Sequence, residues 1–374
     1  MEADVLRVLQ MANGYMGNRL YENLFAALAE KDVENLVYVP VNIADRTASP
    51  EGVTVSHCFS TLDRALYIRK QKKMIRDMEG IYQIPSVDVI HAHTLFSAGY
   101  TALQFQKKYG IPYIVAVRNT DVNVFFKYMV HLRKVGVEIL RHAEKVIFLS
   151  PVYQQKVLEK YVPRSCREEI AEKCLVIPNG IAPLFFANQA QAPRRLESGP
   201  LRLIYVGEIS SNKNLELTIQ AVKLLNDRGI PAVLKAVGTI KEEKYQNLIA
   251  GSPFVQHCER CPQEEVLQHL RGSDIFVMPS HKETFGLVYA EAMSQGLPVL
   301  YTKGEGFDGQ FPEGTVGYAV SDTDAEALAG KILAVKDNYE RMSQNCISLV
   351  NQFNWNGIAA RYAQIYETCA EKSR

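Results

Sequence analysis

The stretch 274–300 constrains the fold of this chain more than any other. A short apolar run at 275–278 predicts a buried strand, a polar loop follows, and the composition of 285–293 predicts a helix that ends at Gly296. A second apolar run begins at Pro298. Strand, loop, helix and strand in this order indicate a parallel pair of strands. The loop then lies at the carboxyl end of a strand, where open α/β sheets bind ligands.

Two carboxylates stand eight residues apart in this unit, Glu283 in the loop and Glu291 in the predicted helix. The first backbone N–H groups of the helix have no partner within it and carry the positive end of its dipole, so they favour an anion. Carboxylates accept hydrogen bonds from sugar hydroxyls. The unit is therefore suited to a molecule that is both phosphorylated and polyhydroxylated, such as a nucleotide sugar. The simpler alternative is a helix-start carboxylate and a solvated helix residue.

The segment PSHKETFGLVYAEAMSQGLPV resembles the donor-site signature of the retaining glycosyltransferases of family four, which have the GT-B architecture. The resemblance covers the E-x7-E spacing, the FGLV between the glutamates, the EAM and the G-x-PV that follows. It implies that Glu291 holds the ribose hydroxyls and that Glu283 contacts the transferred sugar. It also implies a donor-site loop whose last three N–H groups cradle the diphosphate: Phe285, Gly286, Leu287 and Val288.

The chain is long enough for two domains, and its composition is that of a folded protein. It has 374 residues, of which 47% are hydrophobic and 22% charged. The formal net charge of +1 argues against a general nucleic-acid binder. No apolar run reaches the length needed to cross a bilayer, and the amino terminus MEADVLRVLQ lacks the features of a signal peptide. We therefore expect a cytoplasmic protein, in solution or at the inner face of the plasma membrane.

Alternating strand and helix patterns run through both halves of the chain. They predict an α/β protein with two doubly wound, Rossmann-like domains that face each other across a cleft. We expect an acceptor-side domain at 1–186, a linker rich in Ala, Gln, Pro, Ser and Gly at 187–199, and a donor-side domain at 200–352. The resemblance implies that 353–374 form a closing helix that crosses back to the first domain.

The first half contributes further candidate residues at predicted strand ends. The resemblance places Gly17 against the donor phosphates, and a plain turn is the alternative. Of His91 and His93, one is expected to reach a ligand and the other to be a core histidine. In a later loop, relatives often carry a histidine towards the donor sugar and an aspartate towards the acceptor. This chain keeps Asp121, and Asn119 is the best substitute for the histidine.

Lys213 lies at the mouth of a strand-loop-helix unit in the second half, where it is suited to neutralise a diphosphate. A solvated loop charge is the alternative. The family shows G-R-L here, followed by a lysine five residues after the arginine. This chain keeps Lys213 but has Glu208 in place of the arginine. The departure removes one of two cations expected on the leaving group, so either another basic residue compensates or the donor pocket differs.

The stretch 64–76 carries six basic residues and no acid. At helical spacing, four of the cations share one face: Arg69, Lys72, Lys73 and Arg76. The stretch is either a solvated helix flank or a surface for anionic lipid headgroups. Because relatives that glycosylate lipid-linked acceptors dock on membranes through basic amino-terminal helices, both interpretations stay open.

The seven cysteines are scattered and odd in number, which is typical of free thiols in a reducing compartment. Cys258 and Cys261 form a C-x-x-C, but no second pair or histidine cluster at zinc spacing accompanies them. We expect two ordinary thiols, no metal site and no cofactor.

Together these observations predict transfer of a sugar from a nucleoside-diphosphate sugar to an acceptor hydroxyl, with retention at the anomeric carbon and without a metal. Lys213 and the loop N–H groups would stabilise the leaving diphosphate, and Glu283, Asn119 and Asp121 would complete the catalytic set. By resemblance, the acceptor is a glycan or a lipid-linked molecule of bacterial surface polysaccharide or oligosaccharide synthesis. The alternatives are a GT-B sugar-nucleotide epimerase, a phosphorylase, and a non-catalytic nucleotide-sugar-binding partner subunit. The base, the sugar and the acceptor are not readable from the sequence.

Overall fold

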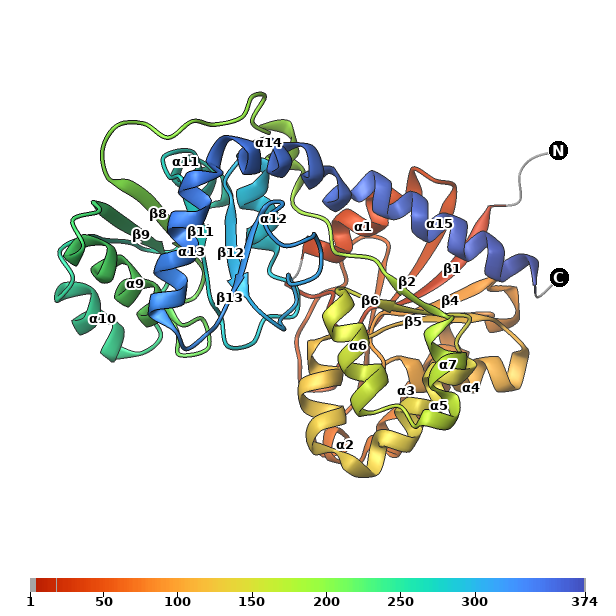
Figure 1. The fold of residues 1–374 in the computed structure, drawn as a ribbon. Helices are drawn as coiled ribbons and strands as arrows, with labels where there is room; N and C mark the ends of the chain where they lie inside the picture. Colours follow the sequence, from red (N-terminus) through yellow and green to blue (C-terminus); the bar gives the residue numbers. More distant parts are fainter. Residues whose placement is uncertain (1–4, 18, 373–374) are drawn as a thin grey trace. The chain divides into compact units, whose positions relative to one another are not determined.

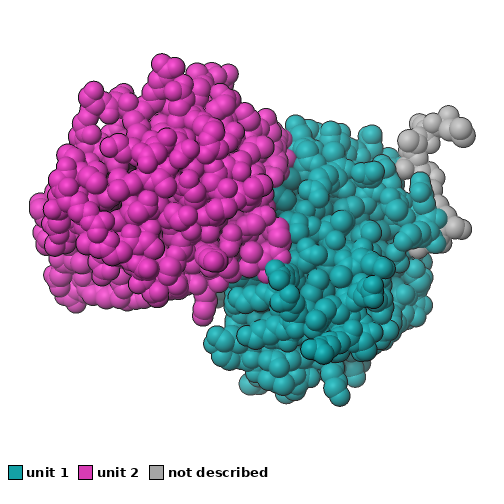
Figure 2. Space-filling view, in the orientation of Figure 1, with its two compact units in different colours: residues 1–149, 153–178, 355–374 teal, residues 150–152, 179–354 magenta. Residues whose placement is uncertain are grey.

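The computed structural model describes residues 5–17 and 19–372. The chain divides into two compact units, which Figure 2 shows in teal and magenta. Unit 1 comprises 1–149, 153–178 and 355–374, and unit 2 comprises 150–152 and 179–354.

Unit 1 is built on a parallel sheet of seven strands in the order β3-β2-β1-β4-β5-β6-β7 (Figure 1). The chain moves outward from β1 in one direction through β2 and β3, then returns to the other side of β1 with β4. This reversal of strand order is the place where doubly wound sheets bind ligands. The strands are β1 (Leu6–Met11), β2 (Val33–Asn42), β3 (Val53–Phe59), β4 (Val89–Ala92), β5 (Tyr113–Ala116), β6 (Lys145–Phe148) and β7 (Cys174–Val176).

Helices cover both faces of this sheet, because successive side chains of its strands point to opposite faces. In β5, Tyr113 and Val115 join the core under α3, α4 and α5, whereas Ile114 and Ala116 join the core under α1 and α15. The helices of unit 1 are α1 (Arg19–Ala29), α2 (Thr61–Ala65), α3 (Tyr67–Ile81), α4 (Gly99–Tyr109), α5 (Arg133–His142), α6 (Pro151–Lys160), α7 (Arg164–Ala171) and α15 (Trp355–Glu371), with the short turns η1 (Ile84–Ser86), η2 (Asp121–Phe126) and η3 (Val130–Leu132).

Unit 2 repeats the plan with a parallel sheet of six strands in the order β10-β9-β8-β11-β12-β13. Its strands are β8 (Leu201–Val206), β9 (Ala232–Val237), β10 (Val255–Cys258), β11 (Ile275–Val277), β12 (Val299–Thr302) and β13 (Gly317–Val320). Its helices are α8 (Pro183–Ala187), α9 (Leu215–Asp227), α10 (Glu243–Ala250), α11 (Gln263–Arg271), α12 (Leu287–Ser294), α13 (Ala325–Asp337) and α14 (Tyr339–Leu349), followed by the turn η4 (Val350–Phe353). The two doubly wound parallel sheets confirm the predicted fold class.

The boundaries between the units differ from the sequence prediction. Residues 179–186, expected in the first domain, belong to unit 2. The expected linker 187–199 also belongs to unit 2, because its backbone is tied there: Ala190 N–H donates to the Ser294 carbonyl at 2.9 Å, and Arg194 N–H to Ser343 Oγ at 2.8 Å. The final helix α15 begins at Trp355 and packs on α1 in unit 1. No helix in the described part of the chain is both long and apolar enough to cross a membrane.

Candidate functional site

Two loops of unit 2 are joined at the carboxyl end of its sheet, one after β8 and one after β11. His281 N–H donates to the Asn212 carbonyl at 2.8 Å, and Asn212 Nδ2 donates to the Lys282 carbonyl at 3.1 Å. Asn214, two residues after Asn212, adopts a left-handed backbone with a φ of 56°, and its side chain donates to the Pro279 carbonyl at 3.0 Å. These hydrogen bonds fix the two loops relative to each other, so that a side chain of one loop contacts a side chain of the other.

Lys213 and Glu283 meet in this way and form an ion pair, and both side chains are largely buried. The backbone of Glu283 is fixed as well: its N–H donates to Glu305 Oε2 at 2.8 Å, and its carbonyl accepts from Gly306 N–H at 2.5 Å. A Cβ on Gly306 would lie 1.9 Å from the Thr284 carbonyl oxygen, so only glycine allows this approach. The structure thus brings together two of the predicted site residues on a rigid frame.

Helix α12 begins at Leu287, directly after this loop, and Gly286 is its N-cap residue. Gly286 has a φ of 76°, and a Cβ there would lie 2.4 Å from the Tyr289 ring, so conformation and space both require glycine. The N–H groups of Gly286, Leu287 and Val288 have no hydrogen-bond acceptor among the described residues. They form the positive end of a helix at the end of a parallel strand, an arrangement that binds anions.

Glu291 lies one turn further along α12. The surrounding protein desolvates its carboxyl group and raises its pKa to about 7. Within the described residues, no hydrogen bond or ion pair satisfies this carboxylate. A carboxylate in this state favours a ligand that brings hydroxyl donors, because the ligand replaces the water that burial removed.

Phe285 has a different place from the one predicted. Its side chain is buried and packs against Phe353 and Phe307, with ring centroids 5.5 and 6.4 Å away. The ring is therefore part of the core of unit 2, and only the backbone of Phe285 faces the loop. The composition of the loop could not show this, because both partner rings come from later parts of the chain.

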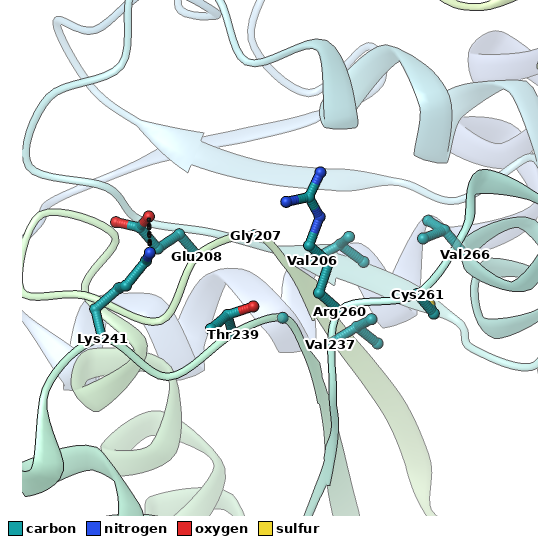
Figure 3. Close-up of a pocket in the computed structure, with 10 residues that line it drawn as sticks. Val206, Gly207, Glu208, Val237, Thr239, Lys241, Arg260, Cys261 and Val266 are labelled. Atoms are coloured by element: carbon teal, nitrogen blue, oxygen red, sulfur yellow. Dashed lines mark ion pairs between the residues drawn. The ribbon is translucent and has the colours of Figure 1, made fainter. Parts of the chain in front are cut away.

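A cavity of about 330 Å³ opens beside this loop frame, at the carboxyl ends of β8, β9 and β10. Figure 3 shows that Glu208 and Lys241 lie on one side of Thr239 and Arg260 on the other. Glu208 pairs with Lys241 at 3.6 Å, so the glutamate in the family's arginine position is neutralised by a cation of the next loop. Lys241 and Arg260 were not predicted as site residues; the available signal was a basic residue after each of two neighbouring predicted strands. The full lining is Val206, Gly207, Glu208, Val237, Gly238, Thr239, Lys241, Arg260, Cys261 and Val266.

Comparisons with known proteins agree with this geometry. Residues 188–348 match the family model "Glycosyl transferases group 1", and residues 17–180 match "Glycosyl transferase 4-like domain". The chain belongs to the group 1 glycosyltransferases. It is 26% identical over 297 residues to the glycogen synthase of Mycobacterium tuberculosis. The aligned region covers 75% of this chain and 68% of that protein.

Solved structures show the same GT-B fold. The sucrose-phosphate synthase of Thermosynechococcus elongatus superposes with a TM-score of 0.73 at 18% identity, over 97% of this chain and 98% of that one. The Anabaena protein HepE, solved in complex with UDP, superposes with a TM-score of 0.70 at 16% identity, over 97% and 99% of the two chains. The prediction of a GT-B glycosyltransferase is thereby confirmed at the level of family and fold.

In unit 1 of this glycosyltransferase, the two histidines are core residues. The His91 and His93 rings are fully buried and stack with centroids 3.7 Å apart. His91 Nδ1 lies 2.7 Å from the Tyr366 hydroxyl, and His93 Nε2 lies 2.8 Å from Gln10 Oε1. Burial holds both pKa values well below the usual range, so the rings are neutral. The expectation that one histidine reaches a ligand is not met, because no part of either ring is exposed.

Asp121 is a structural residue of this glycosyltransferase, which corrects the prediction that it points to an acceptor. It is almost fully buried, and its carboxylate accepts from the backbone N–H groups of Leu95 and Phe96, each at 3.0 Å, and of Arg118 at 2.9 Å. These bonds tie the loop after β4 to the loop after β5. Burial raises the pKa of Asp121, although the three N–H groups and the Arg118 charge oppose this shift.

The other predicted residues of unit 1 remain at its surface. Asn119 is exposed, and its side-chain oxygen accepts from Asn123 Nδ2 at 2.5 Å. Gly17 has a φ of 74° with open space where a Cβ would stand, so the loop needs glycine for its backbone conformation alone. Both positions are compatible with ligand contact, and neither is fixed by the frame that holds Lys213 and Glu283.

A carboxylate of the same unit neutralises part of the basic face of α3. Arg69 and Lys73 pair with the buried Asp63 at 3.0 and 2.6 Å. Hydrogen bonds from Lys73 and from the Ser60 backbone and hydroxyl hold the pKa of Asp63 well below its usual range. Lys72 and Arg76 have no carboxylate partner among the described residues. The predicted face of four cations therefore has two available charges.

Two further sequence expectations concern thiols and metals. Cys258 and Cys261 are free thiols that are neither fully buried nor fully exposed. Among the described residues, no three His, Cys, Asp or Glu side chains are placed to hold a metal ion together.

Proposed function

We propose that this chain transfers a sugar from a nucleoside-diphosphate sugar to an acceptor hydroxyl, with retention at the anomeric carbon. One observation carries the proposal. The N–H groups at the start of α12, which have no hydrogen-bond acceptor among the described residues, lie between two carboxylates: Glu283, which forms an ion pair, and Glu291, which has no hydrogen-bond or ion-pair partner among those residues. A diphosphate that joins two sugars matches this arrangement, with the anion on the amides and a sugar at each carboxylate.

The geometry of unit 2 supports the following position for the donor. The nucleobase occupies the 330 Å³ cavity, and the ribose hydroxyls donate to Glu291. The diphosphate lies on the N–H groups of Gly286, Leu287 and Val288, and the transferred sugar contacts Glu283. The HepE structures with UDP and with UDP-glucose support a uridine nucleotide as the first candidate.

Binding of the donor changes the partners of Lys213. In the ligand-free chain its ammonium group neutralises Glu283. The diphosphate offers more negative charge, so Lys213 turns to the phosphate and Glu283 becomes free to accept from sugar hydroxyls. Lys241 neutralises Glu208, and Arg260 supplies further positive potential at the cavity.

In the reaction, the bond between the anomeric carbon and the diphosphate oxygen breaks, and its electron pair stays on that oxygen. Lys213 and the α12 amides stabilise the developing charge, which is electrostatic catalysis by groups already in position. The acceptor oxygen forms the new bond from the same face, and its proton passes to the leaving phosphate. No metal enters this scheme.

The test combines binding and turnover. A panel of nucleotides and nucleotide sugars is screened for thermal stabilisation of the purified chain, since a ligand at 100 times its Kd adds about 2.7 kcal/mol. We expect the matching donor to stabilise the wild type and to lose most of this effect in Glu291→Ala. Release of free nucleoside diphosphate only in the presence of an acceptor then identifies the transferase. Binding without such release would instead assign a non-catalytic partner, and release without acceptor would contradict the transfer.

For the acceptor, we propose a glycan or lipid-linked molecule, used at an anionic membrane surface. Lys72 and Arg76 supply positive charge, and Leu62, Leu66 and Ile68 nearby in sequence are exposed apolar side chains. Such a combination favours an anionic bilayer, with each basic residue near the surface adding about 1 kcal/mol. Co-sedimentation with phosphatidylserine vesicles checks it: the wild type should sediment and a double Lys72→Gln, Arg76→Gln variant should not. Equal sedimentation of both would place the acceptor reaction in solution.

A further inference from the structure

Three residues stand at the same position relative to three neighbouring strands of unit 1. Asn13, Thr94 and Arg118 each follow the last residue of β1, β4 and β5 by two positions. The strands are paired in parallel in the order β1-β4-β5, so their carboxyl ends form one edge of the sheet. All three side chains are partly buried and are brought to this edge.

Each of the three carries a buried polar atom without a hydrogen-bond partner: Asn13 Oδ1, Thr94 Oγ1 and Arg118 Nη1. Buried polar atoms in folded proteins are almost always satisfied, and each exception calls for a physical reason. One ligand at this edge can supply the missing partners of all three atoms together.

Arg118 is the member of this group that carries charge. Its Nε donates to the His93 carbonyl at 3.2 Å, and the Tyr362 hydroxyl lies near enough for the guanidinium to lower the pKa that burial raises. Within the described residues, no carboxylate lies at ion-pairing distance from Arg118. The nearest candidate, Asp121, is already bonded to three backbone N–H groups.

No described residue of the protein neutralises the positive charge of Arg118. The guanidinium group of an arginine is positively charged in proteins. The stacked histidines beside it are neutral. A partly desolvated cation without a counter-ion is unfavourable, and an anionic ligand removes the penalty.

We propose that the edge formed by Asn13, Thr94 and Arg118, called the Arg118 site here, binds the anionic group of a sugar acceptor. The anionic group, a phosphate or a carboxylate, pairs with Arg118 and accepts from the Thr94 hydroxyl, and a neighbouring sugar hydroxyl donates to Asn13 Oδ1. The inference rests on the proposed transfer function and names the acceptor class as an acidic or phosphorylated sugar. The donor diphosphate does not need Arg118, because unit 2 holds its own ligands for it in the α12 amides and Lys213.

The experiment measures binding separately for four probes: glucose, glucuronate, glucose 6-phosphate and UDP. Isothermal titration of the full chain should detect at least one of the two anionic sugars and no binding of glucose at the same concentration. Glucuronate and glucose 6-phosphate distinguish a carboxylate from a phosphate. Arg118→Gln should weaken the anionic sugar at least tenfold and leave UDP within twofold of the wild type, and Arg118→Lys should restore part of the loss.

Two further variants separate the site from a general effect on folding. Arg141→Gln removes an exposed arginine of the same unit, paired with Glu169 at 3.1 Å, and should leave all four affinities unchanged. Thr94→Val keeps the side-chain volume and should weaken the anionic sugar about threefold to tenfold. It provides the test if Arg118→Gln does not fold.

The outcomes are distinct. The inference is overturned if neither anionic sugar binds the wild type, or if Arg118→Gln weakens UDP as much as the sugar, which would assign Arg118 to the donor. UDP binding and turnover with a neutral acceptor would in that case leave the transfer function standing. Absence of UDP binding and of turnover would refute the transfer function, whereas loss of the anionic sugar in Arg118→Gln alone would still assign the site.

Discussion

The strand ends of unit 1 and unit 2 prepare for ligands in different ways, although both follow the same doubly wound plan. In unit 2 the carboxylate of Glu283 is held by a lysine, a partner that a ligand with more negative charge can take over. In unit 1 the carboxylate of Asp121 is held by three backbone N–H groups, which no ligand can displace without opening two loops. Carboxylates in loops at the carboxyl ends of the two sheets thus have opposite roles, and the difference lies in what they bond to.

The comparison predicts that the largest effect on catalysis comes from unit 2. Lys213→Ala should lower kcat by about 10²–10³-fold, because the variant loses a preorganised cation on the leaving oxygen. The free energy of unfolding should change by only about 1 kcal/mol, since 24% of the Lys213 side chain and 16% of the Glu283 side chain remain exposed and solvent screens the pair. Steady-state kinetics and urea unfolding measure the two quantities. A wild-type kcat in Lys213→Ala would mean that the leaving group is stabilised elsewhere.

The largest effect on stability should come from unit 1. Asp121→Ala leaves three buried N–H groups without an acceptor, and we expect it to lower the free energy of unfolding by about 3 kcal/mol or more. Urea denaturation of Asp121→Ala beside Glu283→Ala checks the contrast, because the second variant should lose activity and little stability. A stable but inactive Asp121→Ala would restore the predicted catalytic role of Asp121 and break the comparison.

Two glycines sharpen the comparison further. Gly286 and Gly17 have nearly the same φ, 76° and 74°, but a Cβ meets the Tyr289 ring at Gly286 and open space at Gly17. Gly17→Ala should therefore cost only the backbone strain of about 1 kcal/mol, and Gly286→Ala about 1–2 kcal/mol more because the ring has to move. Thermal unfolding of the two variants measures the difference. Equal losses would show that the Tyr289 ring gives way without cost.

Much of the fold was predictable from the sequence, because its signals are local. Strand and helix alternation gave the two doubly wound sheets, and the run at 274–300 gave strand, loop and helix in the right order, with α12 starting at Leu287. The sequence placed Lys213 and Glu283 in loops at strand ends, but it did not predict that the two side chains pair with each other. The predictions that were wrong depend on distant partners.

Those distant partners are particular residues. Asp121 bonds to N–H groups 25 and 26 residues away, and Phe285 packs on rings from two later segments. Asp63 comes ten residues before Lys73 and neutralises a face that the helix pattern alone shows as basic. In each case the residue type fitted the family's role, and only the tertiary contact shows which role this chain uses.

The last predicted effect concerns Glu291, and it has the opposite sign for stability. Burial raises the pKa of Glu291 from 4.5 to about 7, so the folded chain binds this proton more tightly than the unfolded chain does. Stability then falls as pH rises from about 4.5 to about 7, where the unfolded chain has released the proton first. Glu291→Gln cannot ionise, so it should be more stable than the wild type at pH 8 by about 1–2 kcal/mol and indistinguishable from it near pH 4.5.

The same ionisation should control the donor. The charged carboxylate accepts ribose hydroxyls more strongly than the neutral acid, so the UDP affinity of the wild type should rise several-fold from pH 6 to pH 8. The phosphates of UDP also titrate, and Glu291→Gln, which binds the same ligand, corrects for this contribution. Titration calorimetry of both proteins at each pH gives the difference. Parallel pH profiles would mean that Glu291 does not contact the nucleotide. Diverging profiles would show that unit 2 retains a destabilising carboxylate because the ligand requires it, whereas Asp121 in unit 1 is retained for the fold.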